Sequence, residues 1–250
     1  MTKRAPVLTI ATLLALAFAA GALDKPKTKD PTMKEVDSGS YGVFVNGHRM
    51  ATETFTISQG ASGGIATADF KTEDNVENKS AQSSEMELSP NGDLHRYEWK
   101  ELSPGKAEVT VFPANDFLTE RAIRSPQDKP EEQPFMLPAS TSILDDYFFS
   151  HRQILIWRYL ATSCKHENNE VKCPVSQKIQ FGTLNPQQRA GSQVSLEFMG
   201  RDKATIRGTE KEFNKFALRS EGGEWFIWVD DQFKMQRILI PGDSTEVIRD

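Results

Sequence analysis

Residues 41–57, YGVFVNGHRMATETFTI, carry the clearest fold signal in the chain. Apolar and polar positions alternate on both sides of Asn46-Gly47, a dipeptide that favours the two-residue turn of a β-hairpin. The face of the returning strand opposite its threonines consists of Ala51, Glu53, Phe55 and Ile57. The stretch therefore predicts an antiparallel hairpin on a half-buried, pleated surface.

Similar patterns continue on both sides of the middle of the chain. A glycine-rich turn at residues 60–64 ends the hairpin, and short runs rich in β-formers then alternate with turn residues. The runs cover residues 65–76, 83–88, 94–101, 107–112, 175–181, 194–198, 204–208, 213–219, 224–229 and 235–240. Because neighbouring runs within each half are joined without helices, they predict an antiparallel meander and argue against a parallel α/β sheet.

The middle of the chain differs from both halves. Residues 125–138 contain four prolines and predict a loop that crosses the surface. Ser142-Ile143-Leu144-Asp145 then resembles a capping box, and apolar residues recur behind it at helical spacing. We therefore expect one helix over residues 143–160, with an apolar face packed on the sheet and the Asp145-Asp146 pair near its positive end.

The N-terminal residues have the three parts of a cleavable signal peptide. Lys3 and Arg4 give a positive start, residues 7–18 form an apolar run, and Ala20-Gly21-Ala22 offers a cleavage site, with Ala17-Phe18-Ala19 as a second choice. The alternative is an uncleaved membrane anchor. The apolar run is shorter than the roughly 20 residues that span a bilayer, so cleavage after Ala22 is the prediction.

This assignment sets the expected organisation of the chain. Residues 1–22 are the signal peptide, residues 23–37 a flexible lead-in, and residues 38–250 a single β-rich domain. The mature chain contains no further stretch of membrane-spanning length, and the signal carries no cysteine that could accept a lipid. We therefore expect a soluble protein that is periplasmic or secreted.

Cys164 and Cys173 are the only cysteines, and a polar, turn-like segment separates them. In an oxidising compartment two such thiols are expected to form a disulfide. Closing so short a loop stabilises a fold by about 2.5 to 3 kcal/mol in the chain-entropy model. The alternative is a metal site that includes His166, but two cysteines and one histidine without a fourth ligand are a poor zinc pattern.

Charge and composition exclude some partners. The chain has 30 basic and 35 acidic residues, and loss of Lys3 and Arg4 with the signal leaves a net charge of −7. The basic residues are spread along the chain instead of forming a stripe, which argues against a nucleic-acid partner. We find no sequence pattern that calls for a metal or another cofactor.

Two features suggest catalysis but have simpler explanations. Residues 60–64 match Gly-x-Ser-x-Gly, yet the nucleophile elbow needs a helix after the serine, and β-type sequence follows here. His48 and His95 lie in strand-like segments where exposure is expected. His151 lies on the apolar face of the predicted helix, where a buried structural histidine is favoured over a catalytic base.

Aromatic residues are concentrated in the predicted helix and in one C-terminal hairpin. If the helix closes one side of a curved sheet, these side chains line the space between them. The candidate cavity residues are Tyr147, Phe148, His151, Leu155, Trp225 and Trp228. Plain core packing is the alternative for any one of them.

The chain resembles the uncharacterised, exported β-rich domains of unknown function found in the envelopes of Gram-negative bacteria. The likeness is carried by residues 41–47, 53–57, 142–150, 228–230 and 237–238. It implies a mainly β fold, a strongly curved antiparallel sheet (a half-barrel or open barrel), similar to the periplasmic lipoprotein carriers LolA and LolB. Those carriers hold acyl chains against a concave sheet. The family supplies no established catalytic residues.

These observations favour a non-enzymatic protein that binds a lipid-like or other apolar ligand, or an envelope partner. One alternative is a hydrolase-type enzyme whose site a single sequence does not reveal. The other is a structural envelope factor without a pocket. A cavity between residues 143–160 and the sheet favours the carrier, whereas an enzyme requires His151 or His95 close to a carboxylate in a cleft.

Overall fold

The computed structural model describes residues 33–167 and 170–250. Thr32–Asp250 forms one compact unit. The predicted signal peptide and most of the predicted lead-in lie outside the described residues.

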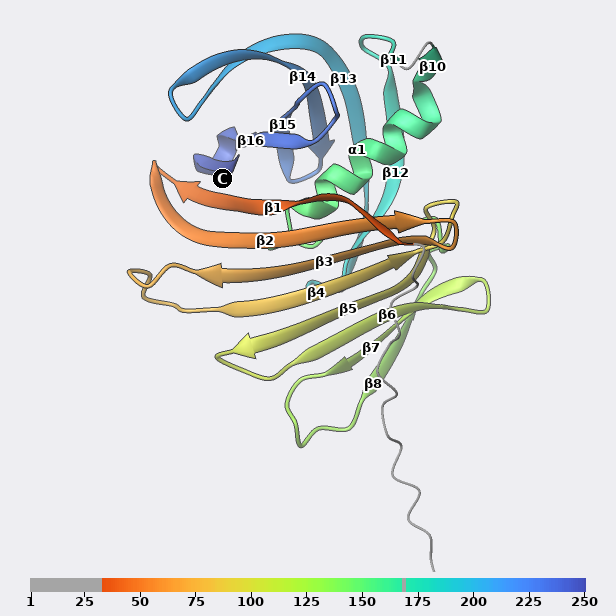
Figure 1. The fold of residues 1–250 in the computed structure, drawn as a ribbon. Helices are drawn as coiled ribbons and strands as arrows, with labels where there is room; N and C mark the ends of the chain where they lie inside the picture. Colours follow the sequence, from red (N-terminus) through yellow and green to blue (C-terminus); the bar gives the residue numbers. More distant parts are fainter. Residues whose placement is uncertain (1–32, 168–169) are drawn as a thin grey trace, which may run out of the picture. The chain divides into compact units, whose positions relative to one another are not determined.

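One sheet of 15 strands dominates this unit (Figure 1). Its first half is an antiparallel meander of β1 (Lys34–Val45), β2 (His48–Gly60), β3 (Gly63–Thr72), β4 (Ala81–Leu88), β5 (Leu94–Ser103), β6 (Glu108–Ala114), β7 (Phe117–Ile123) and β8 (Glu131–Phe135). The second half is a meander of β12 (Lys178–Asn185), β13 (Ala190–Ile206), β14 (Thr209–Ser220), β15 (Gly223–Val229), β16 (Met235–Ile240) and β17 (Thr245–Arg249), with the 3-10 turn η1 (Pro241–Asp243) before β17.

The two meanders are joined by the first and last strands. β1 pairs with β17 in antiparallel register, with Val43 opposite Val247. The short β9 (Ser142–Ile143) lies at the far end of the second meander, parallel to β12. The sheet therefore runs from β8 at one edge to β9 at the other.

Residues 136–141, here called the closing segment, connect these two edges along the chain. So short a segment reaches at most about 25 Å, which forces the sheet to curve until its edges approach. Backbone bonds hold the segment in place: Leu118 N–H donates to Leu137 O, and Leu94 N–H donates to Ala139 O, both at 2.8 Å. The curvature of the sheet is thus imposed by chain connectivity as well as by strand twist.

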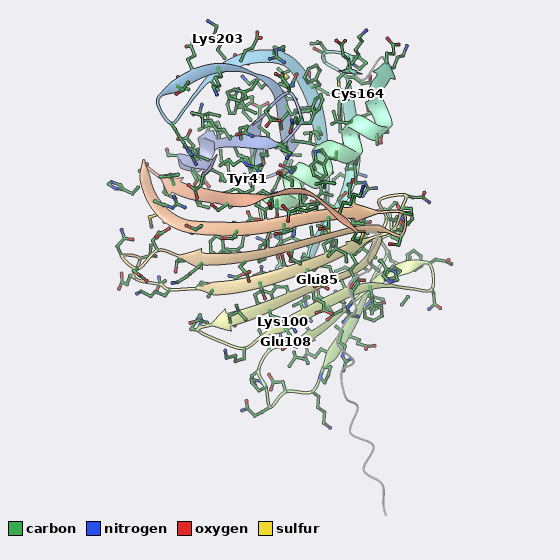
Figure 2. The ribbon with its side chains drawn as sticks, viewed as in Figure 1. Tyr41, Glu85, Lys100, Glu108, Cys164 and Lys203 are labelled. Carbon is green, nitrogen blue, oxygen red and sulfur yellow. A yellow bond between two sulfur atoms is a disulfide. The ribbon has the colours of Figure 1, made fainter. Side chains whose placement is uncertain are left out.

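The helix α1 (Ser150–Ser163) lies between β1 and β2 on one side and β12 and β13 on the other (Figure 1). Side-chain bonds connect it to both meanders: Tyr41 Oη of β1 donates to Gln153, and Tyr159 Oη donates to the carbonyl of Gln177 just before β12. Figure 2 labels Tyr41 near the N-terminal part of α1 and Cys164 at its other end. The helix therefore contacts both meanders and contributes to a core that they share.

The largest fully buried side chains come from α1, its approach and both meanders. They are Tyr41, Tyr97, Tyr159, Phe148, Phe216, Leu118, Ile143, Leu155, Ile156, Leu184, Leu196 and Ile227. On the first meander the opposite face is polar. Lys100 of β5 lies opposite Glu108 of β6, and Figure 2 shows these two side chains on neighbouring strands.

Several sequence predictions are confirmed. The hairpin turns at Asn46-Gly47, whose φ angles are 49° and 78°. The sheet is mainly antiparallel and strongly curved, with one packed helix in the described residues. Cys164 and Cys173 form the predicted disulfide, which brackets the hairpin of β10 (Lys165–Glu167) and β11 (Glu170–Lys172).

The predicted helix over residues 143–160 is wrong at its start. Ser142 and Ile143 form β9 and pair with Thr183 and Leu184, and α1 begins only at Ser150. The capping-box pattern at Ser142 therefore does not cap a helix. The cap of α1 is instead the carboxylate of Glu53 on β2, which the spacing of residues around Ser142 does not reveal.

Three predictions about where strands lie also need correction. The proline-rich stretch 125–138 contains the edge strand β8, where Pro134 is tolerated because one side of the backbone needs no ladder bonds. The run 194–198 and residues 204–206 belong to one strand, β13, with a bulge between Phe198 and Gly200 instead of a turn, and Arg207 and Gly208 form the turn to β14. β1 begins at Lys34, inside the stretch 23–37 expected as a flexible lead-in.

At 14 residues α1 is too short to cross a bilayer, and the described part of the chain holds no other helix that would.

Gly63 gives a test of how tightly β2, β3 and β4 fit together. Its φ is 132°, and a Cβ atom there would lie 2.0 Å from the carbonyl oxygen of Leu88. We expect Gly63→Ala to lower the free energy of unfolding by about 2 to 5 kcal/mol, because both strain and a backbone clash oppose it. Gly64→Ala, whose Cβ would meet only ordinary contacts, should change it by less than about 1 kcal/mol. Equal effects in urea unfolding would contradict this account.

Candidate functional site

The N-terminus of α1 is capped by a carboxylate from the sheet. Glu53 of β2 is fully buried and accepts hydrogen bonds from the backbone N–H groups of Phe149, at 2.6 Å, and Ser150, at 3.1 Å. These groups lack partners within the helix, and the helix dipole favours a negative charge at this end. Burial nevertheless raises the pKa of Glu53 to about 7, while the amide hydrogen bonds and the charge of Arg152 oppose that rise.

A second buried carboxylate lies just before the helix. Asp145 accepts hydrogen bonds from Tyr97 Oη at 2.9 Å, Gln187 Nε2 at 2.7 Å and the backbone N–H of Tyr147 at 3.0 Å. Burial raises its pKa, and these donors oppose the rise. Asp145 thus links β5 to the turn between β12 and β13. The sequence predicted Asp145 at the start of the helix, but the residue precedes α1, which begins at Ser150.

His151 is enclosed in the same region. Its Nδ1 accepts a hydrogen bond from the backbone N–H of Asp145 at 3.4 Å, and its ring packs against the rings of Tyr97 and Phe148. Burial, and then the nearby charge of Arg152, lower its pKa to about 3. The side chain is therefore neutral at ordinary pH, as expected of a structural histidine.

Arg152 is a buried cation, and not all of its hydrogen-bond donors have partners among the described residues. Its side chain is 4% exposed. Nη1 donates to the carbonyl oxygens of Asp145 and Phe148, and the guanidinium lies over the Trp225 ring with Cζ 4.9 Å from the ring centroid. Nη2 is 4.0 Å from Asp146 Oδ1, and Nε has no hydrogen-bond partner among the described residues.

Arg152 forms part of the wall of a pocket of about 290 Å³, here called the Arg152 pocket. The pocket lies between the start of α1 and strands β12 to β15. It is lined by Leu144, Asp146, Arg152, Thr183, Asn185, Gln188, Ala190, Ser192, Val194, Leu218, Ser220, Gly222 and Trp225. Its wall therefore combines one cation, one carboxylate, several side chains that donate and accept hydrogen bonds, and an apolar side.

The structure does not bring the six predicted cavity residues together around one space. Phe148, His151 and Leu155 are buried in the core. Tyr147 is 39% exposed and packs edge-on against Phe70. Of the six, Trp225 alone is part of the Arg152 pocket.

Trp228 lies on the opposite face of β15 from the helix. It packs with Ala204 and Phe213 in a separate small cluster, where the long strands β13 and β14 curl over the sheet. Its indole N–H is 3.3 Å from Asp202 Oδ2. Strand alternation explains the separation, because residues 225 and 228 differ in parity and so point to opposite faces.

The space between α1 and the sheet is largely filled. Leu155, Ile156 and Tyr159 are at most 1% exposed. A pocket of about 180 Å³ remains beside the C-terminal half of α1, bounded by Ile57, Ala66, Leu88, Ile154, Trp157 and Ala161 among others. This volume is below the roughly 300 to 1,000 Å³ of typical ligand sites. We call it the apolar pocket.

Sequence reasoning did not single out Glu53, Arg152 or Gln187. Two signals were available. Glu53 shares its strand face with Ala51, Phe55 and Ile57. Arg152 lies three or four positions from Phe148, Leu155 and Ile156, which places it beside apolar side chains of the helix. A charged residue at a core position is rarely left without a partner, so each marks a tertiary contact.

Metal binding finds no support in the described residues, which contain no cluster of three or more histidine, cysteine, aspartate or glutamate side chains arranged to hold an ion.

The comparisons with known proteins concern the fold. No family model and no curated protein matches the sequence. Among solved structures, the chain is similar to a beta-barrel-like protein of a domain of unknown function, DUF1849, from Brucella abortus. The two share 6% identity with a TM-score of 0.50, and the match covers 85% of this chain and 94% of that one. The likeness shows a β-barrel-like fold, while resemblance to LolA and LolB stays a prediction.

The cap at Glu53 predicts a specific pH dependence of stability. Below about pH 4.5 the carboxyl is protonated in both states; between pH 4.5 and 7 the folded state still binds the proton that the unfolded state has lost. The contribution of Glu53 should therefore fall by about 3 kcal/mol as the pH rises through this window. Glu53→Gln removes this titration.

The measurement is the free energy of unfolding of wild type minus that of Glu53→Gln, from pH 4.5 to 8. We expect this difference to decrease with rising pH. Glu132→Gln, on the exposed edge strand β8, serves as the matched control and should give a flat difference. A flat curve for Glu53→Gln as well would show that burial does not perturb this carboxyl.

Proposed function

We propose that this protein is a non-enzymatic, exported binding protein, periplasmic or secreted, that holds a small ligand in the Arg152 pocket. The observation that carries the proposal is the buried guanidinium of Arg152, whose Nε lacks a partner among the described residues although the side chain lines a pocket. A buried donor left unpaired costs about 1 to 3 kcal/mol, and more on a charged group. A ligand that accepts its hydrogen bond recovers that cost.

Pocket size favours a small ligand over an acyl chain. The Arg152 pocket holds about 290 Å³ and the apolar pocket about 180 Å³, at or below the lower end of typical ligand sites. The wall of the larger pocket is also partly polar. Among the described residues, the lipid-like or apolar ligand expected from the sequence finds two other places. They are the apolar pocket beside α1 and an open pocket of about 480 Å³ whose lining includes Phe135, Met136 and Leu137.

Binding is favoured over catalysis by the state of His151. Its Nδ1 is occupied by a backbone amide, and its pKa of about 3 removes it from proton transfer near neutral pH. His95, the other histidine considered for catalysis, is exposed on β5. Export is supported by the signal-like N-terminal sequence together with the disulfide between Cys164 and Cys173.

Native mass spectrometry of protein purified from the periplasm under mild conditions tests the proposal. We expect an additional bound mass on wild-type protein that is lost in Ala190→Trp, because a large side chain at this exposed position fills the Arg152 pocket. Ala161→Trp is the matched control, since it introduces the same side chain at an exposed position of the apolar pocket. Thermal melts establish that both variants fold.

Loss of the bound mass in Ala161→Trp but not in Ala190→Trp would place the ligand in the apolar pocket and overturn the proposed site. Absence of any bound mass on wild-type protein, in several mild buffers, would overturn the binding function itself.

A further inference from the structure

We propose that the ligand of the Arg152 pocket is a zwitterionic α-amino acid with a compact apolar side chain. This inference rests on the proposed binding function and names its ligand class. It follows from three properties of the pocket wall: the Arg152 side chain, whose buried Nε has no hydrogen-bond partner among the described residues, an adjacent half-exposed carboxylate, and an apolar side beside both.

The free edge of Arg152 suits a carboxylate. Nε and Nη2 lie along one side of the guanidinium, in the fork that binds both oxygens of a carboxylate. Both hydrogen bonds that Arg152 makes to described residues come from Nη1, which donates to Asp145 O and Phe148 O. Within the described part of the chain, Nε has no hydrogen-bond partner, and Nη2 has a contact to Asp146 at 4.0 Å, which is too long for a hydrogen bond.

The neighbouring carboxylate suits an ammonium group. Asp146 is half exposed at the pocket wall, and its Oδ2 accepts a hydrogen bond from Gln188 Nε2 at 2.6 Å. Its Oδ1 is the atom that lies 4.0 Å from Arg152 Nη2. An α-amino acid carries its carboxylate and ammonium on the same carbon, so both charges fit against a cation and an anion that are this close.

Charge balance discriminates between ligand classes. Asp146 and Arg152 are the two charged residues that line the pocket, and their charges cancel. Glu53 and Asp145 also face Arg152, but their oxygens accept hydrogen bonds from helix amides, Tyr97 and Gln187. A simple anion would be repelled by Asp146, and a simple cation by Arg152. A ligand with both charges and no net charge meets neither penalty.

The remaining residues of the pocket wall determine which ligand side chain fits. Leu144, Val194, Leu218 and Trp225 give the pocket an apolar side, and one ring of Trp225 already packs on Arg152. Burying an aliphatic group there contributes roughly 25 cal/mol per Å². With about 290 Å³ available, a single amino acid of the size of valine or leucine is accommodated.

Isothermal titration calorimetry with three matched probes tests the ligand class. L-Leucine carries both charges, 4-methylpentanoate lacks the ammonium group, and 3-methylbutylamine lacks the carboxylate. We expect leucine to bind at least about tenfold more tightly than either analogue, since each analogue forfeits one charge-assisted hydrogen bond. Equal or tighter binding of an analogue would overturn the zwitterion.

Asp146→Asn assigns the ammonium contact. The variant should bind leucine at least about tenfold more weakly and 4-methylpentanoate more tightly, because the substitution removes an attraction in the first case and a repulsion in the second. Asp116→Asn, in the exposed turn between β6 and β7, makes the same charge change away from the pocket and should alter neither affinity. Parallel weakening of both ligands would show that Asp146 does not contact the ammonium.

The two levels of the proposal fail differently. If leucine does not bind, but wild-type protein carries another mass that Ala190→Trp abolishes, the amino-acid class is wrong and the binding site stands. If neither leucine nor any co-purified mass depends on residue 190, both are wrong.

Discussion

The structure depends on the contact between Glu53 and the first amides of α1. A helix placed inside a rolled sheet exposes its terminal N–H groups to the core instead of to water, where leaving them unpaired is costly. The carboxylate of Glu53 meets this need at 2.6 Å from Phe149 N and 3.1 Å from Ser150 N. By fixing where α1 begins, it also fixes Arg152, in the first turn of the helix, against Trp225, and so the wall of the pocket.

Arg152 and Glu53 also show why a polar interior persists in this fold. Each is costly to bury, and backbone groups offset part of that cost: amides donate to Glu53, and carbonyl oxygens accept from Arg152. The rings of Phe149 and Trp225 also lie against the Arg152 guanidinium. The network extends through Asp145 and Gln187 to both meanders. Removing any one member leaves another charge or donor without a partner, so these residues act as a unit.

The sheet was predictable from sequence and the site was not. Alternation, the Asn46-Gly47 turn and the cysteine spacing are local, and each predicted its structure. The predicted start of α1 was wrong because the group that caps the helix comes from Glu53, almost a hundred residues earlier in the chain. Trp225 and Trp228 were predicted to line one cavity, but the alternation of side chains along β15 places them on opposite faces of the sheet. The lack of a partner for Arg152 Nε within residues 33–167 and 170–250 results from three-dimensional packing, which no rule on sequence spacing can predict.

The pairing of β1 with β17 has a consequence for how the chain acquires its structure. Val43 lies opposite Val247, so the first strand of the described residues can complete its pairing only after the last one has been synthesised. Contacts so distant in sequence form late, because the entropy of closing a loop that spans nearly the whole domain must be overcome first. Until the C-terminal residues arrive, β1 has no partner on the side that β17 occupies, so the two meanders cannot join into one sheet before the whole domain is available.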